Sequence, residues 1–203
     1  MHSMAPKSFL QFWSAFHELP EYLAYSTGLL APDRVAVEFR HSSWLEPVEQ
    51  ATTLGLLASL GAAYVCVDEP RIEACNVLPP LAVATADTAY VRFHGRNAAT
   101  WNARTGSAAE RFKHLYSTEE LVEWVEPVRH LQEGASTTYL MFNNCFADYA
   151  PRNAQQMLSL LDFSPGSERW PAGLTATNET GGAPEGAPPR HSQLPSENDP
   201  VRP

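Results

Sequence analysis

Arg92, His94 and Arg96 occupy alternate positions of the segment YVRFHGR, residues 90–96. Alternate residues of a β-strand point to the same face, so a strand would project these three side chains together. Guanidinium groups bind phosphate and carboxylate oxygens through paired hydrogen bonds, and an imidazole can carry a proton near neutral pH. The segment therefore predicts a site for a small anionic molecule.

Other strand-like segments also end in polar residues, namely Glu38, Arg40, His41, Asp68, Asn143 and Asn144. The alternation within AYVCVDE puts Asp68 on the side opposite Val65 and Val67. If the carboxyl ends of these strands meet, one face of the sheet would collect the charged groups. We therefore expect a common mouth surrounded by Glu38, Arg40, Asp68, Arg92 and His94.

The predicted site assigns a different role to each kind of residue. The catalytic set is His94, Glu38 and Asp68, in which the histidine moves a proton and the carboxylates act as base or orienting groups. The ligand-binding set is Arg40, His41, Arg92, Arg96, Asn143 and Asn144. A structural interpretation stays open for each residue type: buried ion pairs for the charges, internal hydrogen bonding for the histidines and strand-end capping for the asparagines.

Strand-like and helical patterns alternate along the chain. Strands are predicted at FLQF, VAVEFR, AYVCVDE, AYVRFH and TYLMFNN, and helices at residues 19–30, 45–60, 118–132 and 151–161, with an irregular segment over 70–86. This alternation is typical of β/α units on a parallel sheet. Ser117 and Glu120 have the spacing of a capping box, and Pro127 predicts a kink or an early end in its helix.

The two faces of these strands differ in polarity. Parallel strands that helices cover on both sides are usually apolar throughout, whereas these strands keep charged groups on one face. A closed (β/α) barrel accounts for the difference, because one parity of every strand lines its interior and the strand carboxyl ends face the pocket. The segment 97–115, which contains Trp101, is predicted to be a loop over that pocket, either a lid or a mobile surface loop.

The composition excludes two classes of partner. The chain has 203 residues, is 44% hydrophobic and carries a formal net charge of −9. Its basic residues are scattered, so a surface that follows a nucleic-acid backbone is not expected. No segment approaches a membrane span of about 20 apolar residues, and the start MHSMAPKSFLQFW does not resemble a signal peptide. We expect neither nucleic acid nor membrane as a partner.

Cys66, Cys75 and Cys145 form no CxxC pair and leave an odd thiol, so the sequence favours a reducing, cytoplasmic location without a disulfide framework or a zinc site. GxSxG, P-loop and GxGxxG motifs are absent, and no cofactor is identified.

An alternative to the anion site is a site for a divalent metal ion, held by Glu38, His41, Asp68 and His94. Neighbouring arginines would repel such a cation.

Five segments in order carry a resemblance to a known family. They are VAVEFRHSSW, VDEP, YVRFHGRN, LYSTEELVEW and FNNCFADYAPRNA. From about Phe9 to Leu161 the chain resembles the YecE-like family, the domain of unknown function seventy-two. The resemblance implies a TIM-type barrel and leaves the reaction open. Ser42 departs from the family pattern, in which a proline is usual at this position.

Members of that family begin with further strands, so the resemblance implies that this chain carries five of eight β/α units. Closing such a barrel takes eight strands and about 250 residues. Residues 1–161 are therefore expected to form a partial barrel domain, poorly stable unless a partner supplies the rest. Residues 162–203 are rich in Pro, Gly, Ser, Thr and Glu and are expected to be a disordered tail.

The expected function is binding of a small phosphate- or carboxylate-bearing molecule at the carboxyl ends of the strands. This site would serve a hydrolase or a lyase, or an inactive truncated relative of one. The alternative is a non-catalytic module that binds a metabolite or a partner.

Overall fold

The computed structural model describes residues 8–12, 20–103 and 107–162, which lie in the first of two compact units, Met1–Trp170. Within these residues five strands form a sheet in the order β1-β2-β3-β4-β5, and all neighbouring strands are parallel. The strands are β1 (Ser8–Phe12), β2 (Val35–Phe39), β3 (Ala63–Asp68), β4 (Thr88–Phe93) and β5 (Thr137–Phe142). The predicted parallel α/β fold is confirmed.

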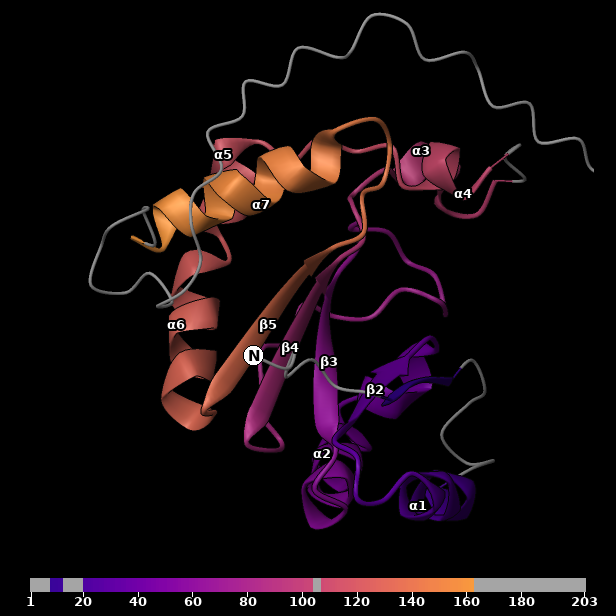
Figure 1. Cartoon of the computed structure of the whole chain (residues 1–203). Helices are drawn as coiled ribbons and strands as arrows, with labels where there is room; N and C mark the ends of the chain where they lie inside the picture. Colours follow the sequence, from indigo (N-terminus) through magenta and orange to yellow (C-terminus); the bar gives the residue numbers. More distant parts are fainter. Residues whose placement is uncertain (1–7, 13–19, 104–106, 163–203) are drawn as a thin grey trace, which may run out of the picture. The chain divides into compact units, whose positions relative to one another are not determined.

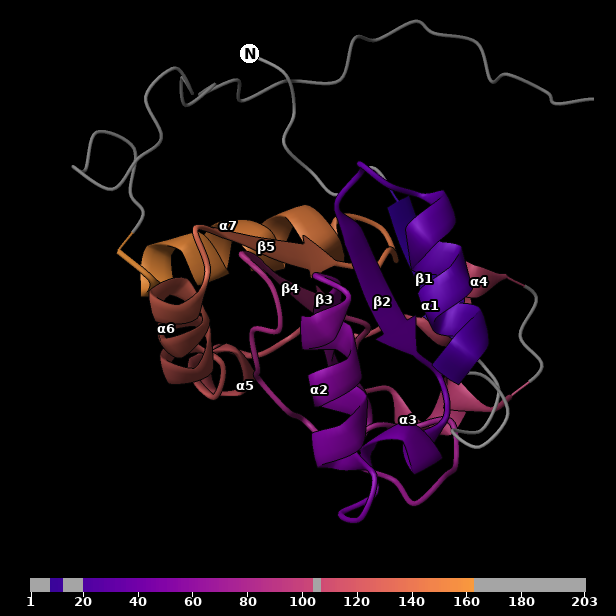
Figure 2. The same ribbon diagram turned by 90° about the horizontal axis from the view of Figure 1, so that it is seen from below.

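Helices connect most of these strands. They are α1 (Pro20–Leu29), the 3-10 helix η2 (Ser42–Leu45), α2 (Gln50–Ser59), α3 (Ala98–Trp101), α4 (Ala108–Arg111), α5 (Thr118–Val122), α6 (Val125–Gly134) and α7 (Tyr149–Leu160). Figure 1 shows β3, β4 and β5 side by side, with their carboxyl ends directed toward α3 and the start of α7. Figure 2 shows α1 next to β1 and β2, with α6 at the opposite end of the row of strands.

The helix predicted over residues 45–60 begins later than predicted, and Leu45 belongs to a separate element. The 3-10 helix η2 ends before Pro47, and α2 begins only at Gln50. A residue that precedes proline disfavours helical geometry, and Glu46 accordingly has φ −59° and ψ 149°. Pro47 therefore separates η2 from α2, and the residues between them are not helical, contrary to the prediction.

The helix predicted over residues 118–132 is also divided, into α5 and α6. The capping box is present: the Ser117 side chain accepts from the Glu120 N–H, and the Glu120 side chain accepts from the Ser117 N–H. The interruption comes before Pro127, which lies in the first turn of α6. The proline ring would clash with the carbonyl of Glu123 in a continuous helix, so the helix breaks there.

The face predicted for Asp68 is wrong, although Asp68 does lie opposite Val65 and Val67 as the alternation within β3 predicts. Strand pairing sets Val67 beside Arg92 and Asp68 beside Phe93. Paired residues of neighbouring strands share a face, so Val67 lies on the face of Arg92 and Glu38, whereas Asp68 points to the opposite face. Every residue of β3 is buried, and a strand buried on both faces has no polarity difference from which its orientation can be read.

Aromatic rings pack the sheet against the helices on the Phe93 face. Phe39 stacks on Trp44 with ring centroids 4.4 Å apart. Phe93 stacks on Phe142 at 4.4 Å and meets Trp124 edge-on at 5.4 Å. Stacked and edge-to-face pairs of this kind add to the free energy that burial of the rings contributes. They fix the carboxyl ends of β2, β4 and β5, next to the polar residues of interest.

Two predictions concern segments at the limits of the described residues. The tail predicted over 162–203 lies outside them apart from Asp162. The segment 97–115 contains α3 and α4 and includes residues 104–106, which also lie outside; its action as a lid stays a prediction. In the described part of the chain, no helix combines the length and the apolar character needed to cross a membrane.

Candidate functional site

Polar side chains from the carboxyl ends of β2 to β5, and from the residues that directly follow them, meet around a buried carboxylate. We name this set the Glu38 cluster; its members are Glu38, Arg40, Glu69, Arg92, His94 and Asn143. Glu38 Oε1 accepts a hydrogen bond from Arg40 Nη1 at 2.9 Å, and Glu38 Oε2 accepts one from Arg92 Nη1 at 2.8 Å. His94 Nε2 lies 3.2 Å from Glu38 Oε1. These four residues meet as their alternation along the strands predicts.

Hydrogen bonding selects one tautomer of His94. Arg40 Nη1 donates to two carboxylates, at 2.9 and 2.7 Å, which leaves no hydrogen for His94 Nε2 at 3.1 Å. Asn143 Oδ1 accepts from an arginine, so Asn143 Nδ2 donates to His94 Nδ1 at 3.2 Å. The ring proton is therefore on Nε2, and it is donated to Glu38 Oε1.

Burial and charge act in opposite directions on Glu38. Burial would raise the pKa of Glu38, but the hydrogen bond from His94 and the charges of Arg92 and Arg40 outweigh it and lower the pKa to about 2. Burial lowers the pKa of His94, although contact with Glu38 opposes this change. At neutral pH an ionised carboxylate therefore faces a neutral imidazole and two guanidinium groups.

Glu69 is a member of the cluster that sequence reasoning missed. It directly follows β3 and is 2% exposed. Its Oε1 accepts from Arg40 Nη1 at 2.7 Å, and its Oε2 accepts from the Leu78 backbone N–H at 2.9 Å. Burial raises the pKa of Glu69 to about 7, while Arg40 and the Leu78 N–H oppose that rise. Glu69 lies two residues after Val67 and therefore continues its face of the strand. This spacing would have placed Glu69 in the cluster, had the orientation of β3 been known.

A second buried carboxylate, Asp68, forms a separate group on the Phe93 side. We name this set the Asp68 cluster; its members are Asp68, Arg71, Arg96, Tyr116, Glu123 and Trp124. Asp68 Oδ1 accepts from Arg96 Nε at 2.8 Å and the Tyr116 hydroxyl at 2.9 Å; Oδ2 accepts from Arg96 Nη2 at 2.7 Å and Trp124 Nε1 at 2.5 Å. The prediction that Asp68 and Arg96 join Glu38 is therefore wrong.

Gly95 marks the change from one cluster to the other. Its φ of +92° lies in the region that favours glycine, so the chain turns out of the strand and Arg96 no longer continues the alternation of Arg92 and His94. The Gly95 N–H donates to the Tyr116 hydroxyl at 2.8 Å.

His41 and Asn144 make contacts outside the Glu38 cluster. His41 Nδ1 accepts from the Ser43 backbone N–H at 3.3 Å and caps η2. Asn144 Nδ2 donates to the His114 carbonyl at 2.9 Å and to Asn153 Oδ1 at 2.8 Å, joining the end of β5 to α7. These contacts agree with the structural interpretation of both residues, and their role in ligand binding stays a prediction.

Two aromatic side chains cover part of the Glu38 cluster. The Trp101 ring lies 5.5 Å from Arg40 Cζ and 6.1 Å from the His94 ring, and Phe112 lies 5.7 Å from the His94 ring. Arg40 is 6% and His94 2% exposed, whereas the Arg92 side chain is 21% exposed. Arg92 is therefore the cationic member of the cluster that solvent reaches most readily.

Comparison with known proteins identifies the family of this chain. Residues 4–174 match a family described as a protein of unknown function, DUF72. The chain belongs to the DUF72 family. The UPF0759 protein YunF of Bacillus subtilis (strain 168) is 31% identical over 145 residues, which make up 70% of this chain and 51% of that protein.

Solved DUF72 structures share the fold. A DUF72 family protein of Thermotoga maritima is 36% identical, with a TM-score of 0.66, and the match covers 77% of this chain and 58% of that one. One of Enterococcus faecalis is 30% identical, with a TM-score of 0.69, and the match covers 78% and 59%. The chain therefore spans about half the length of the curated DUF72 relative and less than two thirds of these structures.

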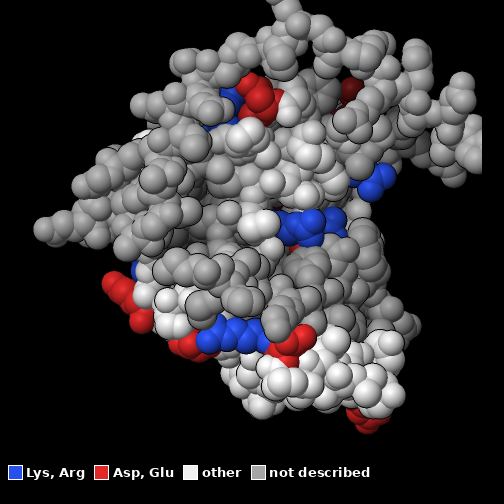
Figure 3. Space-filling model, in the orientation of Figure 1, with Lys and Arg blue, Asp and Glu red and all other residues white. Residues whose placement is uncertain are grey.

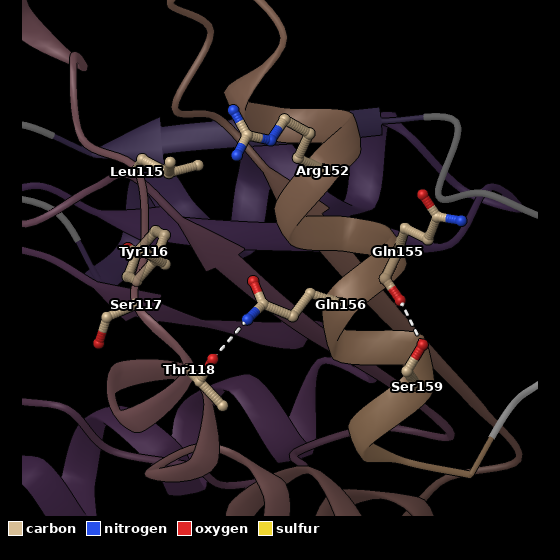
Figure 4. Close-up of a pocket in the computed structure, with 8 residues that line it drawn as sticks. All are labelled: Leu115, Tyr116, Ser117, Thr118, Arg152, Gln155, Gln156 and Ser159. Carbon is tan, nitrogen blue, oxygen red and sulfur yellow. Dashed lines mark hydrogen bonds between the residues drawn. The ribbon is translucent and has the colours of Figure 1, made fainter. Parts of the chain in front are cut away.

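Two cavities in this DUF72 chain lie away from the Glu38 cluster. One, of about 560 Å³, lies between residues 115–118 and α7. Figure 4 shows its lining residues, with Gln156 hydrogen-bonded to Thr118. The other, of about 220 Å³, is bordered by Arg71, Glu123 and Trp124 of the Asp68 cluster. Neither cavity is lined by a member of the Glu38 cluster.

The described basic side chains on the face of the DUF72 chain drawn in Figure 3 do not gather into one large surface. In Figure 3 the Lys and Arg atoms on the described part of the face form small separate groups rather than a continuous basic surface. Among the described residues, no group of three or more His, Cys, Asp or Glu side chains has an arrangement that could hold a metal ion. The metal set of Glu38, His41, Asp68 and His94 is thus not brought together. Cys66, Cys75 and Cys145 are free thiols.

Proposed function

We propose that the Glu38 cluster binds the phosphate or carboxylate group of a small molecule. The observation that carries the proposal is the exposure of Arg92, which joins a buried network of two arginines and a neutral histidine to solvent. A guanidinium group can offer paired N–H donors to an oxyanion. In this arrangement Arg92 contacts the ligand first, and Asn143 supplies a neighbouring amide.

The proposal places the five strands as consecutive units of a TIM-type (β/α) barrel in a domain over residues 1–161, followed by a separate tail over 162–203. The sequential strand order and the polar carboxyl ends support the barrel, because ligand sites of such barrels lie at that end. The odd number of cysteines supports a cytoplasmic location.

The catalytic form of the proposal is a hydrolase or a lyase. His94 would move the proton and Glu38 would hold its ring, because His94 Nε2–H is donated to Glu38 Oε1. Asp68, predicted as a third catalytic group, lies in the other cluster and is assigned a supporting role. Arg96 pairs with Asp68 and is assigned to the same role.

A non-catalytic binding module is favoured by one specific observation. His94 is 2% exposed, and both of its ring nitrogens already have partners within the cluster. A buried histidine in this state orients neighbouring groups without exchanging protons with a ligand. Saturable binding of a phosphate ester that is recovered unchanged would distinguish this form from a hydrolase or lyase.

The binding proposal is tested by NMR titration of the full chain with inorganic phosphate and with acetate. Arg92→Ala is expected to weaken binding at least about tenfold, since a hydrogen bond to a charged group contributes about 1.5–3 kcal/mol. Arg129→Ala is the matched control, because Arg129 pairs with the exposed Glu126 on α6. Equal affinities of the wild type and Arg92→Ala for both anions would refute the proposal.

A further inference from the structure

The charges of the Glu38 cluster balance when both of its carboxylates are ionised. With His94 neutral, Glu38 and Glu69 then offset the positive charges of Arg40 and Arg92. In that state the cluster has no net positive charge to attract an anion. Addition of one proton to a carboxylate leaves an excess of one positive charge, so an anion should favour the protonated form.

The two carboxylates are not equally able to take up this proton. Glu38 accepts hydrogen bonds from Arg40, Arg92 and His94, two of which are cations. Glu69 accepts from only one cation, Arg40, which it shares with Glu38, and from one backbone N–H. Protonation of Glu69 therefore loses fewer charge-assisted contacts than protonation of Glu38.

The groups around Glu69 support the same assignment. Arg40 and Glu38 face it from β2, and the Leu78 N–H faces it from the loop over 70–86. The adjacent Asp68 is held by Arg96 in the other cluster. Burial raises the pKa of Glu69 to about 7, and the charges of Glu38 and Asp68 add smaller increases. Arg40 and the Leu78 N–H oppose this rise. Glu69 can therefore gain or lose a proton near neutral pH.

We infer that an anion binds to the Glu38 cluster together with one proton and that Glu69 carries this proton. The inference rests on the proposed function, since it concerns the regulation of the same site. It makes anion affinity depend on pH through a residue that does not itself contact the ligand. Glu69 is therefore a positioning residue: its protonation changes the net charge of the cluster, and its contact with the cluster is through Arg40.

The probe is inorganic sulfate, whose charge stays constant near neutral pH. Its affinity for the full-length chain is measured by NMR titration at fixed ionic strength. The wild type is expected to bind sulfate about tenfold more tightly near pH 6 than near pH 8, because the protonated fraction of a group with a pKa of about 7 changes by that factor. Calorimetry near pH 7, in two cationic buffers of different ionisation enthalpy, should detect proton uptake on binding.

Glu69→Gln replaces the carboxylate with an uncharged side chain of the same shape. This variant should bind sulfate with pH-independent affinity, close to that of the wild type at the acidic end, and without proton uptake. Glu73→Gln removes an exposed carboxylate from the same loop and is the matched control. It should keep the pH dependence of the wild type.

The outcomes separate this inference from the proposed function. Sulfate binding by the wild type with no pH dependence and no proton uptake overturns the role of Glu69 while leaving anion binding intact. An unchanged pH dependence in Glu69→Gln does the same. If the wild type binds no sulfate at any pH and Arg92→Ala behaves identically, both the inference and the proposed function fail. Because proton uptake is measured on the wild type, a variant that does not fold leaves the inference testable.

Discussion

Glu38 and Asp68 are both fully buried carboxylates near the ends of adjacent strands, yet their environments differ. Asp68 accepts from a tyrosine, a tryptophan and both nitrogens of one arginine fork, so it ties the rings beside α5 and α6 to the sheet. Glu38 accepts from two arginines and a histidine carried by strands. The first arrangement saturates one carboxylate with donors that include two aromatic side chains, whereas the second shares a carboxylate among two arginines and a histidine, of which Arg92 is partly exposed.

The difference shows how one chemical group can serve two purposes. A carboxylate whose acceptor positions are filled by rigid, buried donors holds elements in place and has no free capacity for a ligand. A carboxylate shared among cations keeps those cations together while one of them, Arg92, remains partly exposed. We therefore expect the Asp68 cluster to control stability and the Glu38 cluster to control anion binding.

The largest expected effect is that of Asp68→Asn. Arg96 would lose its buried anion, and the free energy of unfolding should fall by about 3–5 kcal/mol, as measured by urea denaturation. Asp148→Asn, which removes an exposed carboxylate paired with Arg152, should change it by less than about 0.5 kcal/mol. Sulfate affinity of the folded Asp68→Asn variant should match that of the wild type. A large loss of affinity there would show that the clusters act as one.

The second prediction concerns the pH dependence of stability. Glu69 has a pKa of about 7 in the folded chain against an ordinary value of 4.5, so the folded state holds its proton more tightly. Its contribution to stability is complete below about pH 4.5 and is lost as the pH rises through about 7. Over this range the wild type should lose about 3 kcal/mol relative to Glu69→Gln.

Urea denaturation at several pH values measures this difference, with Glu73→Gln as control. Parallel stability curves for the wild type and Glu69→Gln would contradict the prediction. Glu38 acts in the opposite sense, because its pKa is lowered from 4.5 to about 2. Its contribution is present above about pH 4.5 and is lost as the pH falls through about 2.

The smallest expected effect is at the junction between the clusters. A Cβ on Gly95 would lie 2.9 Å from His114 Cβ, at a φ of +92°, so Gly95→Ala should lower the free energy of unfolding by about 1–3 kcal/mol. Gly55→Ala in α2 meets nothing within 4 Å and should raise it by about 0.5–1 kcal/mol. Thermal and urea denaturation of both variants test the contrast. A neutral Gly95→Ala would mean that the turn does not separate Arg96 from His94.

Much of the site could be predicted from the sequence where strands have faces of different polarity. In β4 the alternation of Ala89, Val91 and Phe93 with polar residues correctly put Arg92 and His94 on one side. In β2 the same rule linked Glu38 with Arg40. Such a pattern is encoded locally, because alternate side chains of a strand share a face whatever the neighbouring strands do.

Local sequence therefore determined the parallel α/β fold, the order of its elements and four members of the Glu38 cluster. Tertiary structure alone decided that Glu69, and not Asp68, joins Glu38, because β3 is buried on both faces and only pairing with β2 and β4 sets its orientation. The pairing of Arg96 with Asp68 was also decided there. It depends on the positive φ of Gly95 and on rings brought in from distant parts of the chain.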